Sequence, residues 1–367
     1  MSDQKCRWGI LSTASIARKN WKAIMNTGNG AVTAVASRDE NRSRSYINEN
    51  QAEAPFYPVP KAYGSYDELL AAEDVDAIYI PLPTGLRKEW VIKAAAAGKH
   101  VMCEKPCGIN KEDLTEMIAA CDKAGVQFMD GVMYMHSKRL PVMRSVLDDG
   151  EVVGNIKRIT SQFSFCAPEE FLTGNIRMHS DLEPMGCLGD LGWYNARFSL
   201  WAMNYEMPAE VNGRMLSSTG RDDSPHPVPT EFSAELRWSN GVSASFYNSF
   251  LTEHQQLAHI SGDKGYLTLD DFVLPFFSNE VSFETNNSEF VVEGCEFTME
   301  GHLRQHVVNE YSNGAPDSQE TNLFRNFGDL VLSGKTDDFW PEVALKTQTI
   351  LDACLESARN NCATVRL

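Results

Sequence analysis

A lysine at the end of an apolar run could act on an oxygen atom of a ligand. Lys105 follows such a run in HVMCEKPCGIN, residues 100–110, at the point where a buried strand is expected to end. An ammonium group beside a reacting oxygen stabilises the negative charge that develops there and lowers the pKa of a neighbouring acid. From these residues alone, an ordinary surface lysine remains the alternative.

A carboxylate and a phenol lie four residues apart further along the chain. Asp190 and Tyr194, in GDLGWYNARF, would share one face of a helix, because side chains at this spacing are neighbours. A phenol has a pKa of about 10, so proton transfer near neutral pH requires nearby positive charge. The alternative for Tyr194 is a packed core aromatic whose hydroxyl has found a partner.

A turn of small residues follows the first expected strand. In GILSTASIA, residues 9–17, serine and alanine stand at the three places where dinucleotide-binding turns carry glycine. Small side chains let the backbone approach a pyrophosphate, and the helix that follows directs N–H groups and its positive dipole end at it. We therefore expect cofactor contacts from Ser12, Thr13, Ala14, Ser15 and Ile16. A tight turn without a ligand is the alternative.

The second expected strand ends in Ser37, Arg38 and Asp39, where such domains read the adenosine ribose. An acidic residue at the tip itself would repel a 2′-phosphate, whereas Ser37 and Arg38 can donate hydrogen bonds to one. The pattern favours NADP over NAD, although NAD stays possible. The alternative to phosphate binding is that Arg38 is a solvated turn residue and Asp39 is a helix cap.

Alternating strands and helices must position these groups. Apolar runs of strand type alternate with amphipathic stretches over the first 150 residues. The expected strands span residues 7–11, 31–36, 77–82, 100–103 and 127–133, and the expected helices span 16–25, 40–50, 86–97 and 111–124. This order is typical of a doubly wound parallel sheet. We expect an α/β Rossmann domain over residues 1–134.

The second half follows a different pattern. Apolar residues alternate with polar ones on both sides of Asn240 and Gly241, which predicts a β-hairpin. A second hairpin is expected in HISGDKGYLTL, residues 259–269. We expect an α+β domain over residues 135–367 with a large, mostly antiparallel open sheet. Its last helix, residues 341–360, should pack back towards the first domain.

Charge and composition limit the partners. The chain has 367 residues and a formal net charge of -17, which argues against nucleic acid and anionic membranes. No apolar run approaches the roughly 20 residues of a membrane span, and the N-terminus lacks the pattern of a secretory signal. Nine cysteines, an odd number, predict reduced thiols in the cytoplasm. Cys103 and Cys107 form an isolated pair with poor metal spacing, so we expect no metal site.

Six segments together resemble the glucose–fructose oxidoreductase / inositol dehydrogenase (Gfo/Idh/MocA) family. They are GILSTASIA, VASRD, KAYGSYDELL, HVMCEKPCGIN, GCLGDLGWYNARF and ALKTQTILDACLESA, which occur in the family's order and cover nearly the whole chain. The nearest likeness is to the dimeric dihydrodiol dehydrogenase and NADP-dependent aldose (xylose) dehydrogenase branch. The resemblance implies hydride transfer between nicotinamide C4 and a hydroxyl-bearing carbon of a sugar, polyol or dihydrodiol.

The resemblance also implies roles for individual residues. Lys105 would hydrogen-bond the reacting hydroxyl beside the nicotinamide, and the proline after it often has a cis peptide bond in this family. Tyr194 would accept the proton when an alcohol is oxidised, with Asp190 and Lys105 orienting substrate and base. Further contacts are implied to the cofactor from Pro83, Thr84 and Glu104, and to the substrate from Tyr134, Arg177, Asp190 and Tyr194. Arg177 could equally form a structural salt bridge, and Tyr134 is expected at a strand end.

Three functions stay open from the sequence. The first is an NADP-dependent dehydrogenase of sugars or cyclic diols. The second is an enzyme of the same family that keeps its cofactor bound throughout turnover, either exchanging two sugars or assisting glycoside cleavage. The third is an NADP-binding sensor without catalysis. For assembly, an apolar sheet face left bare by helices would need a cover, so we expect a homodimer through residues near 232–250, with a tetramer possible.

Overall fold

The computed structural model describes residues 4–367, which divide into two compact units. The first unit comprises the chain up to His136 together with Asp181–Pro184 and Tyr311–Thr349. The second unit comprises Ser137–Ser180, Met185–Glu310 and Ile350–Leu367. The domain boundary that we expect at residues 134 and 135 stays a prediction.

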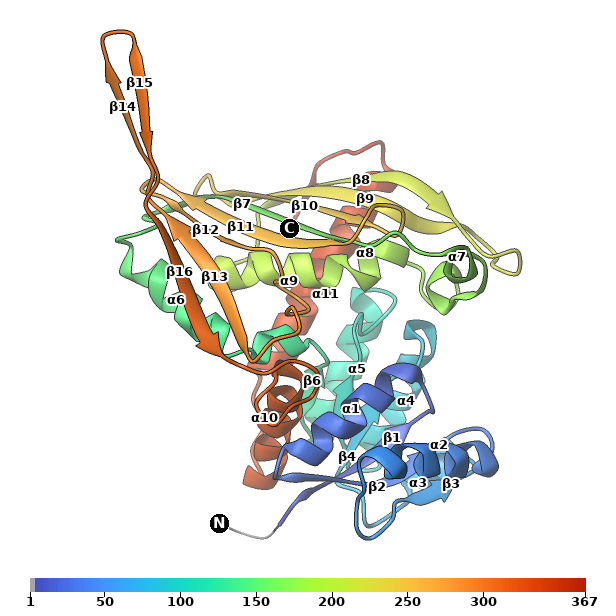
Figure 1. Cartoon of the computed structure of the whole chain (residues 1–367). Helices are drawn as coiled ribbons and strands as arrows, with labels where there is room; N and C mark the ends of the chain where they lie inside the picture. The colour runs from blue at the N-terminus through green and yellow to red at the C-terminus, as the bar shows by residue number, and fades with distance from the viewer. Residues whose placement is uncertain (1–3) are drawn as a thin grey trace. The chain divides into compact units, whose positions relative to one another are not determined.

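A parallel sheet forms the frame of the first unit (Figure 1). Its order is β3-β2-β1-β4-β5-β6, and all neighbouring strands are parallel. The strands are β1 (Cys6–Leu11), β2 (Gly30–Ala36), β3 (Lys61–Tyr63), β4 (Ala77–Ile80), β5 (His100–Cys103) and β6 (Phe128–Asp130). The helices are α1 (Ser15–Asn26), α2 (Glu40–Glu53), α3 (Tyr66–Leu70), α4 (Thr84–Ala96), α5 (Lys111–Ala124), η1 (Met133–His136) and α10 (Gln319–Ser333). This part of the expected fold class is confirmed, although the sequence pattern did not reveal β3.

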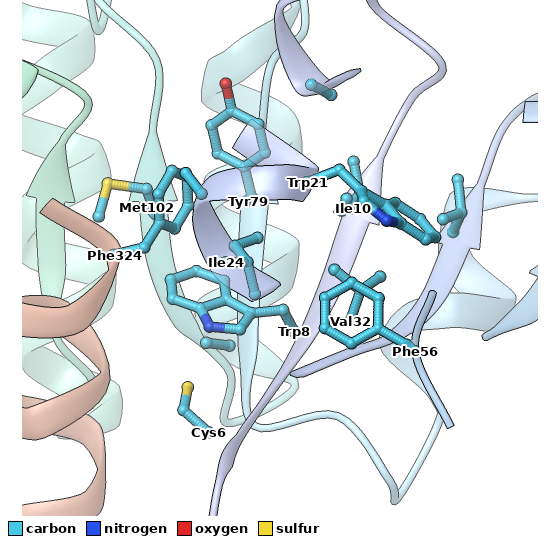
Figure 2. Packing of buried hydrophobic residues seen from close by; sticks show 14 of the residues in the cluster. Cys6, Trp8, Ile10, Trp21, Ile24, Val32, Phe56, Tyr79, Met102 and Phe324 are labelled. Carbon is cyan, nitrogen blue, oxygen red and sulfur yellow. The ribbon is translucent and has the colours of Figure 1, made fainter. Parts of the chain in front are cut away.

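The core of the first unit contains side chains from both ends of the sequence. Trp8 of β1 contacts Phe324 and Phe327 of α10, with ring centroids 5.2 and 5.1 Å apart. Trp21 of α1 packs on Phe56 at 5.3 Å. Figure 2 shows this cluster, in which the large rings fill the space beside the first strand. Because buried aromatic side chains dominate core energetics, α10 is an integral part of this unit.

In the part of the chain that the structure describes, a nine-stranded sheet forms the frame of the second unit. Its order is β16-β13-β12-β11-β7-β10-β9-β8-β17, and β7–β10 is the parallel pair in an otherwise antiparallel sheet. The strands are β7 (Ile156–Ser164), β8 (Glu210–Thr219), β9 (Val228–Arg237), β10 (Ser243–Ser249), β11 (Gln255–Gly262), β12 (Tyr266–Leu269), β13 (Glu280–Asn286), β16 (Leu303–Asn309) and β17 (Val365–Arg366). The expected open, mostly antiparallel sheet is confirmed.

Both hairpins predicted from the sequence are present. β9 and β10 pair Arg237 with Ser243 around the Asn-Gly turn, and β11 and β12 pair Ser261 with Tyr266. The last expected helix is α11 (Phe339–Arg359). The remaining elements are α6 (Arg139–Asp149), α7 (Glu169–Gly174), η2 (Ile176–Met178), α8 (Gly186–Asp190), α9 (Gly192–Ala202) and a separate hairpin of β14 (Glu289–Glu293) and β15 (Glu296–Glu300).

Helices cover one face of the nine-stranded sheet. Helix α8 contacts β9, and α9 contacts β7 and β10. The apolar members of the alternating strands, such as Phe232, Leu236 and Phe246, are buried on this side. The expectation that an apolar face is left bare is therefore wrong. Alternation in the sequence shows that one face of a sheet is apolar and the other polar, but it does not show which face the helices cover. Within residues 4–367, no helix is both long and apolar enough to cross a membrane.

Candidate active site

The carboxyl end of β5 is fixed by a chain of hydrogen bonds around Glu104. Tyr79 of β4 donates its hydroxyl to Glu104 Oε1 at 2.6 Å, and Asn20 Nδ2 donates to the same hydroxyl at 2.6 Å. The Lys105 amide lies 3.2 Å from Glu104 Oε2. Figure 2 shows Tyr79 with its hydroxyl directed away from Trp8. Burial, and then the Glu104 carboxylate, raise the pKa of Tyr79, so its proton stays in place to hold that carboxylate.

A buried arginine fixes the backbone on both sides of Lys105. Arg87 donates from Nη1 to the carbonyl of Glu104 at 2.8 Å and also to the carbonyl of Pro106. Its Nε donates to the carbonyl of Leu82 at 2.7 Å, two residues beyond the end of β4 at Ile80. The Lys105–Pro106 peptide bond is cis, as the family resemblance implies. The ends of two adjacent strands are thereby tied around the lysine.

Thr84, expected to contact the cofactor, makes hydrogen bonds to protein groups. Its amide donates to Glu183 Oε1 at 3.0 Å and its hydroxyl to Glu183 Oε2 at 2.6 Å. The hydroxyl also lies 3.2 Å from the carbonyl of Pro106. The first turn of α4, which follows Pro83, is therefore anchored to the same segment that carries Lys105. Cofactor contacts from Pro83 and Thr84 stay predictions.

The turn between β1 and α1 has the features of a pyrophosphate site. Ser12 has a φ of 121°, a conformation for which glycine is the usual residue. Its amide donates to the carbonyl of Ala36 at 2.9 Å, and its hydroxyl lies 3.2 Å from the Ala14 amide. No side chain caps α1, and its first turn contains no acidic residue. The N–H groups of that turn suit an anion.

The residues after β2 divide into structural and exposed groups. The buried Ser37 hydroxyl donates to the carbonyl of Asp39 at 2.7 Å, and Asp39 accepts from the Asn41 amide at 2.9 Å. The helix-cap alternative for Asp39 is confirmed. Arg38 is exposed. Since the Ser37 hydroxyl already donates its hydrogen bond to the backbone of the turn, Arg38 is the better candidate for a phosphate contact.

Arg42 is a candidate that the sequence reasoning missed. This exposed side chain of α2 donates from Nε to Thr13 Oγ1 at 2.9 Å, so it reaches the turn after β1. Arg38 and Arg42 also act electrostatically on the same group, the hydroxyl of Tyr66. The available signal was the position of Arg42 in the first turn of the helix that follows Arg38. Two cations near an uncapped helix N-terminus fit a dinucleotide with a 2′-phosphate.

The second unit holds the other expected catalytic residues. Arg177 Nε lies 2.8 Å from Asp190 Oδ1, which confirms the salt-bridge alternative for Arg177. Asp190 ends α8, whereas Tyr194 belongs to α9, which begins at Gly192. The expectation of one continuous helix is therefore wrong. A Cβ atom at Gly192 would lie 2.8 Å from Asn248 Oδ1, so close packing on β10 rather than helical periodicity governs this joint.

Both candidate tyrosines are buried within their units. Tyr194 is 6% exposed, and its ring centroid lies 5.7 Å from that of Phe163. Tyr134 is 1% exposed and lies in the short helix η1, so its expected place at a strand end is wrong. Strand β6 ends at Asp130, three residues before its predicted end, so the chain has already left the strand when it reaches Tyr134. The substrate contacts predicted for both tyrosines stay predictions.

The thiols beside Lys105 are buried. Cys103 Sγ lies 3.9 Å from the carbonyl of Cys107. Burial raises the pKa of Cys107, and the neighbouring Cys103 acts in the same direction. A protonated thiol is a poor metal ligand. Among residues 4–367, no group of three or more His, Cys, Asp or Glu side chains could hold a metal ion.

Comparison with protein families assigns both parts of the chain. Residues 6–132 match the oxidoreductase family model with an NAD-binding Rossmann fold, and residues 142–268 match the model of the GFO/IDH/MocA C-terminal domain. The chain belongs to the GFO/IDH/MocA oxidoreductase family. The family expected from the six sequence segments is thus confirmed. The N-terminal part of this GFO/IDH/MocA protein is a nicotinamide-dinucleotide-binding domain.

Curated relatives of this GFO/IDH/MocA protein match the expected branch. It is 29% identical over 359 residues to D-xylose 1-dehydrogenase (NADP(+)) 2 of Haloferax volcanii, covering 97% of this chain and 98% of that protein. It is 30% identical over 273 residues to trans-1,2-dihydrobenzene-1,2-diol dehydrogenase of Mus musculus, covering 73% and 76%.

Solved structures share the fold over almost the whole length. A 3-ketoreductase from Actinomadura kijaniata, in complex with NADP and TDP-benzene, superimposes with a TM-score of 0.77 at 24% identity, covering 96% of this chain and 98% of that one. The aldose-aldose oxidoreductase of Caulobacter crescentus gives a TM-score of 0.79 at 22% identity, covering 99% and 100%. At these identities the likeness concerns the fold.

Proposed function

We propose that this protein is an NADP-dependent oxidoreductase that acts on a hydroxyl-bearing carbon of a sugar, polyol or dihydrodiol. The observation that carries the proposal is the position of Lys105. It follows the carboxyl end of a parallel strand, where open α/β sheets bind their ligands. The buried Arg87 and the Tyr79–Glu104 hydrogen bond fix the backbone on either side of it. The names of the curated relatives supply the substrate class.

The proposed division of labour follows from the chemistry of three side chains. Lys105 hydrogen-bonds the reacting hydroxyl and stabilises negative charge on its oxygen. Tyr194 takes the hydroxyl proton, and Asp190, held by Arg177, orients the substrate. The nicotinamide, when bound, supplies hydride chemistry at C4. Lys105 lies in the first unit and the other residues in the second, so their joint action is part of the proposal.

Two substitutions test the catalytic roles. Lys105→Met should lower the turnover number by orders of magnitude and leave coenzyme affinity nearly unchanged, because the lysine acts on the substrate oxygen. Tyr194→Phe should behave similarly and remove the alkaline rise of the rate. Arg44→Ala, on the exposed side of α2, is the matched control for a lost cation. Activity should be screened across aldoses, polyols and dihydrodiols, and near wild-type activity in either variant would refute the site.

Coenzyme choice is tested separately. If Arg38 and Arg42 hold the 2′-phosphate, Arg38→Ala and Arg42→Ala should weaken NADP by roughly 1–3 kcal/mol and leave NAD almost unaffected. Ser37→Asp should go further, since it adds repulsion and an acceptor for the ribose hydroxyls. Dissociation constants for both coenzymes at one ionic strength decide the matter. Equal weakening of NADP and NAD would remove the basis of the assignment.

Three further properties belong to this proposal. The coenzyme leaves after each turnover, in contrast to family members that retain it, and a rapid-mixing experiment that follows coenzyme release would distinguish the two. The reaction takes place in the cytoplasm, as the odd number of cysteines led us to expect, and the protein works as a homodimer through its second sheet. Gel filtration with light scattering tests the assembly, and a tetramer would reveal an additional interface.

A further inference from the structure

Helix α9, which carries Tyr194, is buried along its whole length, Gly192–Ala202. Figure 1 shows the helix lying along the nine-stranded sheet, and it contacts β7 and β10. Most of its side chains are apolar, and the attraction between apolar surfaces has no preferred direction. Apolar packing therefore holds the helix against the sheet, but it does not specify how far the helix is turned about its own axis.

Buried polar side chains supply the missing direction. Asn195, the residue after Tyr194, donates from Nδ2 to Ser161 Oγ of β7 at 2.8 Å. Asn248 of β10 donates from Nδ2 to Asn195 Oδ1 at 2.7 Å. The side chains of Ser161, Asn195 and Asn248 belong to residues that are at most 1% exposed. Together they form one chain of hydrogen bonds from β10 through α9 to β7, the Asn248–Asn195–Ser161 chain.

The sheet carries both ends of this chain on adjacent strands. In the parallel pair of β7 with β10, Ser161 lies beside Phe246. Two residues further along, Phe163 lies beside Asn248, so these four side chains share the face that the helices cover. The Phe163 ring packs against that of Tyr194, with centroids 5.7 Å apart. The same block of side chains therefore anchors the helix and supports the candidate base.

The beginning of α9 fits closely against the same asparagine. A Cβ atom on Gly192 would lie 2.8 Å from Asn248 Oδ1. This buried oxygen accepts no hydrogen bond from the protein groups that the structure describes. Burying an acceptor in this way costs free energy, and an apolar side chain would avoid the cost. Stability alone therefore does not explain an asparagine at this position.

We propose that the Asn248–Asn195–Ser161 chain positions Tyr194, with Asn195 as its central positioning residue. This role rests on the function proposed above, in which Tyr194 takes the hydroxyl proton. Directional hydrogen bonds to two strands fix the rotation of α9 and with it the direction of the phenol. A catalytic group acts efficiently only when it is held close to its productive geometry. Asn195 thus acts on the reaction through Tyr194.

The first experiment measures turnover in a double-mutant cycle. Asn195→Leu keeps the branched shape of the side chain and removes both of its hydrogen bonds. It should lower the turnover number about 10–100-fold, because a displacement of about 1 Å can cost that much, and leave KM almost unchanged. In the Tyr194→Phe background it should cost almost nothing further, since it acts through the phenol. The assay uses NADP and the most active alcohol of the aldose, polyol and dihydrodiol panel.

A matched control separates this role from a loss of stability. Ser199→Ala removes another buried hydroxyl of α9, one that donates to the carbonyl of Asn195 at 3.0 Å within the helix itself. It should leave the turnover number near the wild-type value. Circular dichroism and the thermal midpoint verify that each variant is folded. If Asn195→Leu does not fold, Ser161→Ala takes its place, because this smaller change removes only the last acceptor of the chain.

The second experiment observes the tyrosine without a substrate. The protein contains 11 tyrosines, and in protein labelled with fluorotyrosine the fluorine NMR resonance of Tyr194 is the one that Tyr194→Phe removes. Asn195→Leu should shift or broaden this resonance, because the phenol is no longer held in one direction. Ser199→Ala should leave it in place.

The outcomes separate this role from the function on which it rests. Lost turnover and a displaced Tyr194 resonance in Asn195→Leu, with no further loss in the Tyr194→Phe background, support the positioning role. Near wild-type turnover in Tyr194→Phe refutes the catalytic role of Tyr194, and the positioning role falls with it. If Tyr194→Phe is impaired but Asn195→Leu costs the same factor in both backgrounds, or leaves the resonance unchanged, the positioning role alone is overturned.

Discussion

Ser12 holds a backbone conformation that side chains avoid, and this has a measurable cost. Both Ser12→Gly and Ser12→Ala remove the hydroxyl that accepts from the Ala14 amide. Only glycine relieves the strain of a φ of 121°. Strain of this kind costs roughly 1–3 kcal/mol, and glycine gives back up to about 1 kcal/mol in chain entropy. We expect Ser12→Gly to be more stable than Ser12→Ala by about 1 kcal/mol in urea denaturation, and equal stability would show that the turn is unstrained.

His100 should make the stability of the protein fall in mild acid. Its Nδ1 lies 2.9 Å from the Gln127 amide, which donates to it, so this nitrogen carries no proton. Burial lowers the pKa of His100 in the folded protein. The unfolded chain therefore binds the proton first as pH falls below about 6.5, and the stability present at neutral pH is lost towards the lower folded pKa.

The substitution His100→Asn tests this assignment, because an amide oxygen can accept the same hydrogen bond without titrating. Urea midpoints at pH 7.5 and 5.5 should fall less between the two values in the variant than in the wild type. His259 and His306 also have pKa values lowered by burial, so a smaller slope is expected to remain. An unchanged slope would exclude His100 as a contributor.

At the scale of elements, α11 and β8 approach too closely for a side chain between them. A Cβ atom on Gly213 would lie 2.0 Å from the carbonyl oxygen of Cys354. The Gly213 amide also donates to Ser357 Oγ at 3.0 Å. Gly213→Ala must push the helix from the strand, and overpacking of this kind costs typically 1–3 kcal/mol. Gly174→Ala, where nothing lies within 4 Å, is the control, and thermal midpoints that fall equally would contradict the close approach.

The elements were predictable where the signal is local. Alternation around Asn240 and the run of strands and helices before residue 134 both depend on neighbours in sequence, and the structure contains them. The parallel pairing of β7 with β10 joins Arg158 to Ser243, and no local pattern reveals such a distant partner. The break between α8 and α9 has a similar origin, because Gly192 meets Asn248 of another element.

The site was predictable in part for related reasons. The family segments identify Lys105, and the structure supplies what surrounds it. An arginine in the first turn of a helix usually faces water, so the sequence could not indicate that Arg87 of α4 is buried and binds three carbonyls. Arg42 became a candidate only when α2 brought it to Thr13. Side chains that act through tertiary contacts need the fold before they can be assigned.

At the scale of the whole molecule, the first unit cannot be cut out at residue 136. Phe324 and Phe327 of α10 cover Trp8 of β1, and a fragment that ends at His136 would leave that indole exposed. We expect such a fragment to be unfolded or aggregated and the full chain to show cooperative unfolding. Tryptophan fluorescence and heteronuclear NMR of the fragment test this, and a well-dispersed spectrum would contradict it.

The same interleaving sets an order of events on the ribosome. Domains of many proteins fold as they emerge, with the N-terminal one first, at synthesis rates of roughly 5–20 residues per second. Here the strands of the dinucleotide-binding sheet emerge early, whereas α10 emerges only after all strands of the nine-stranded sheet except β17. For on the order of ten seconds or more at these rates, the apolar surface around Trp8 in the nascent first unit therefore stays uncovered. During that interval it is a natural client for chaperones that bind exposed aromatic surface.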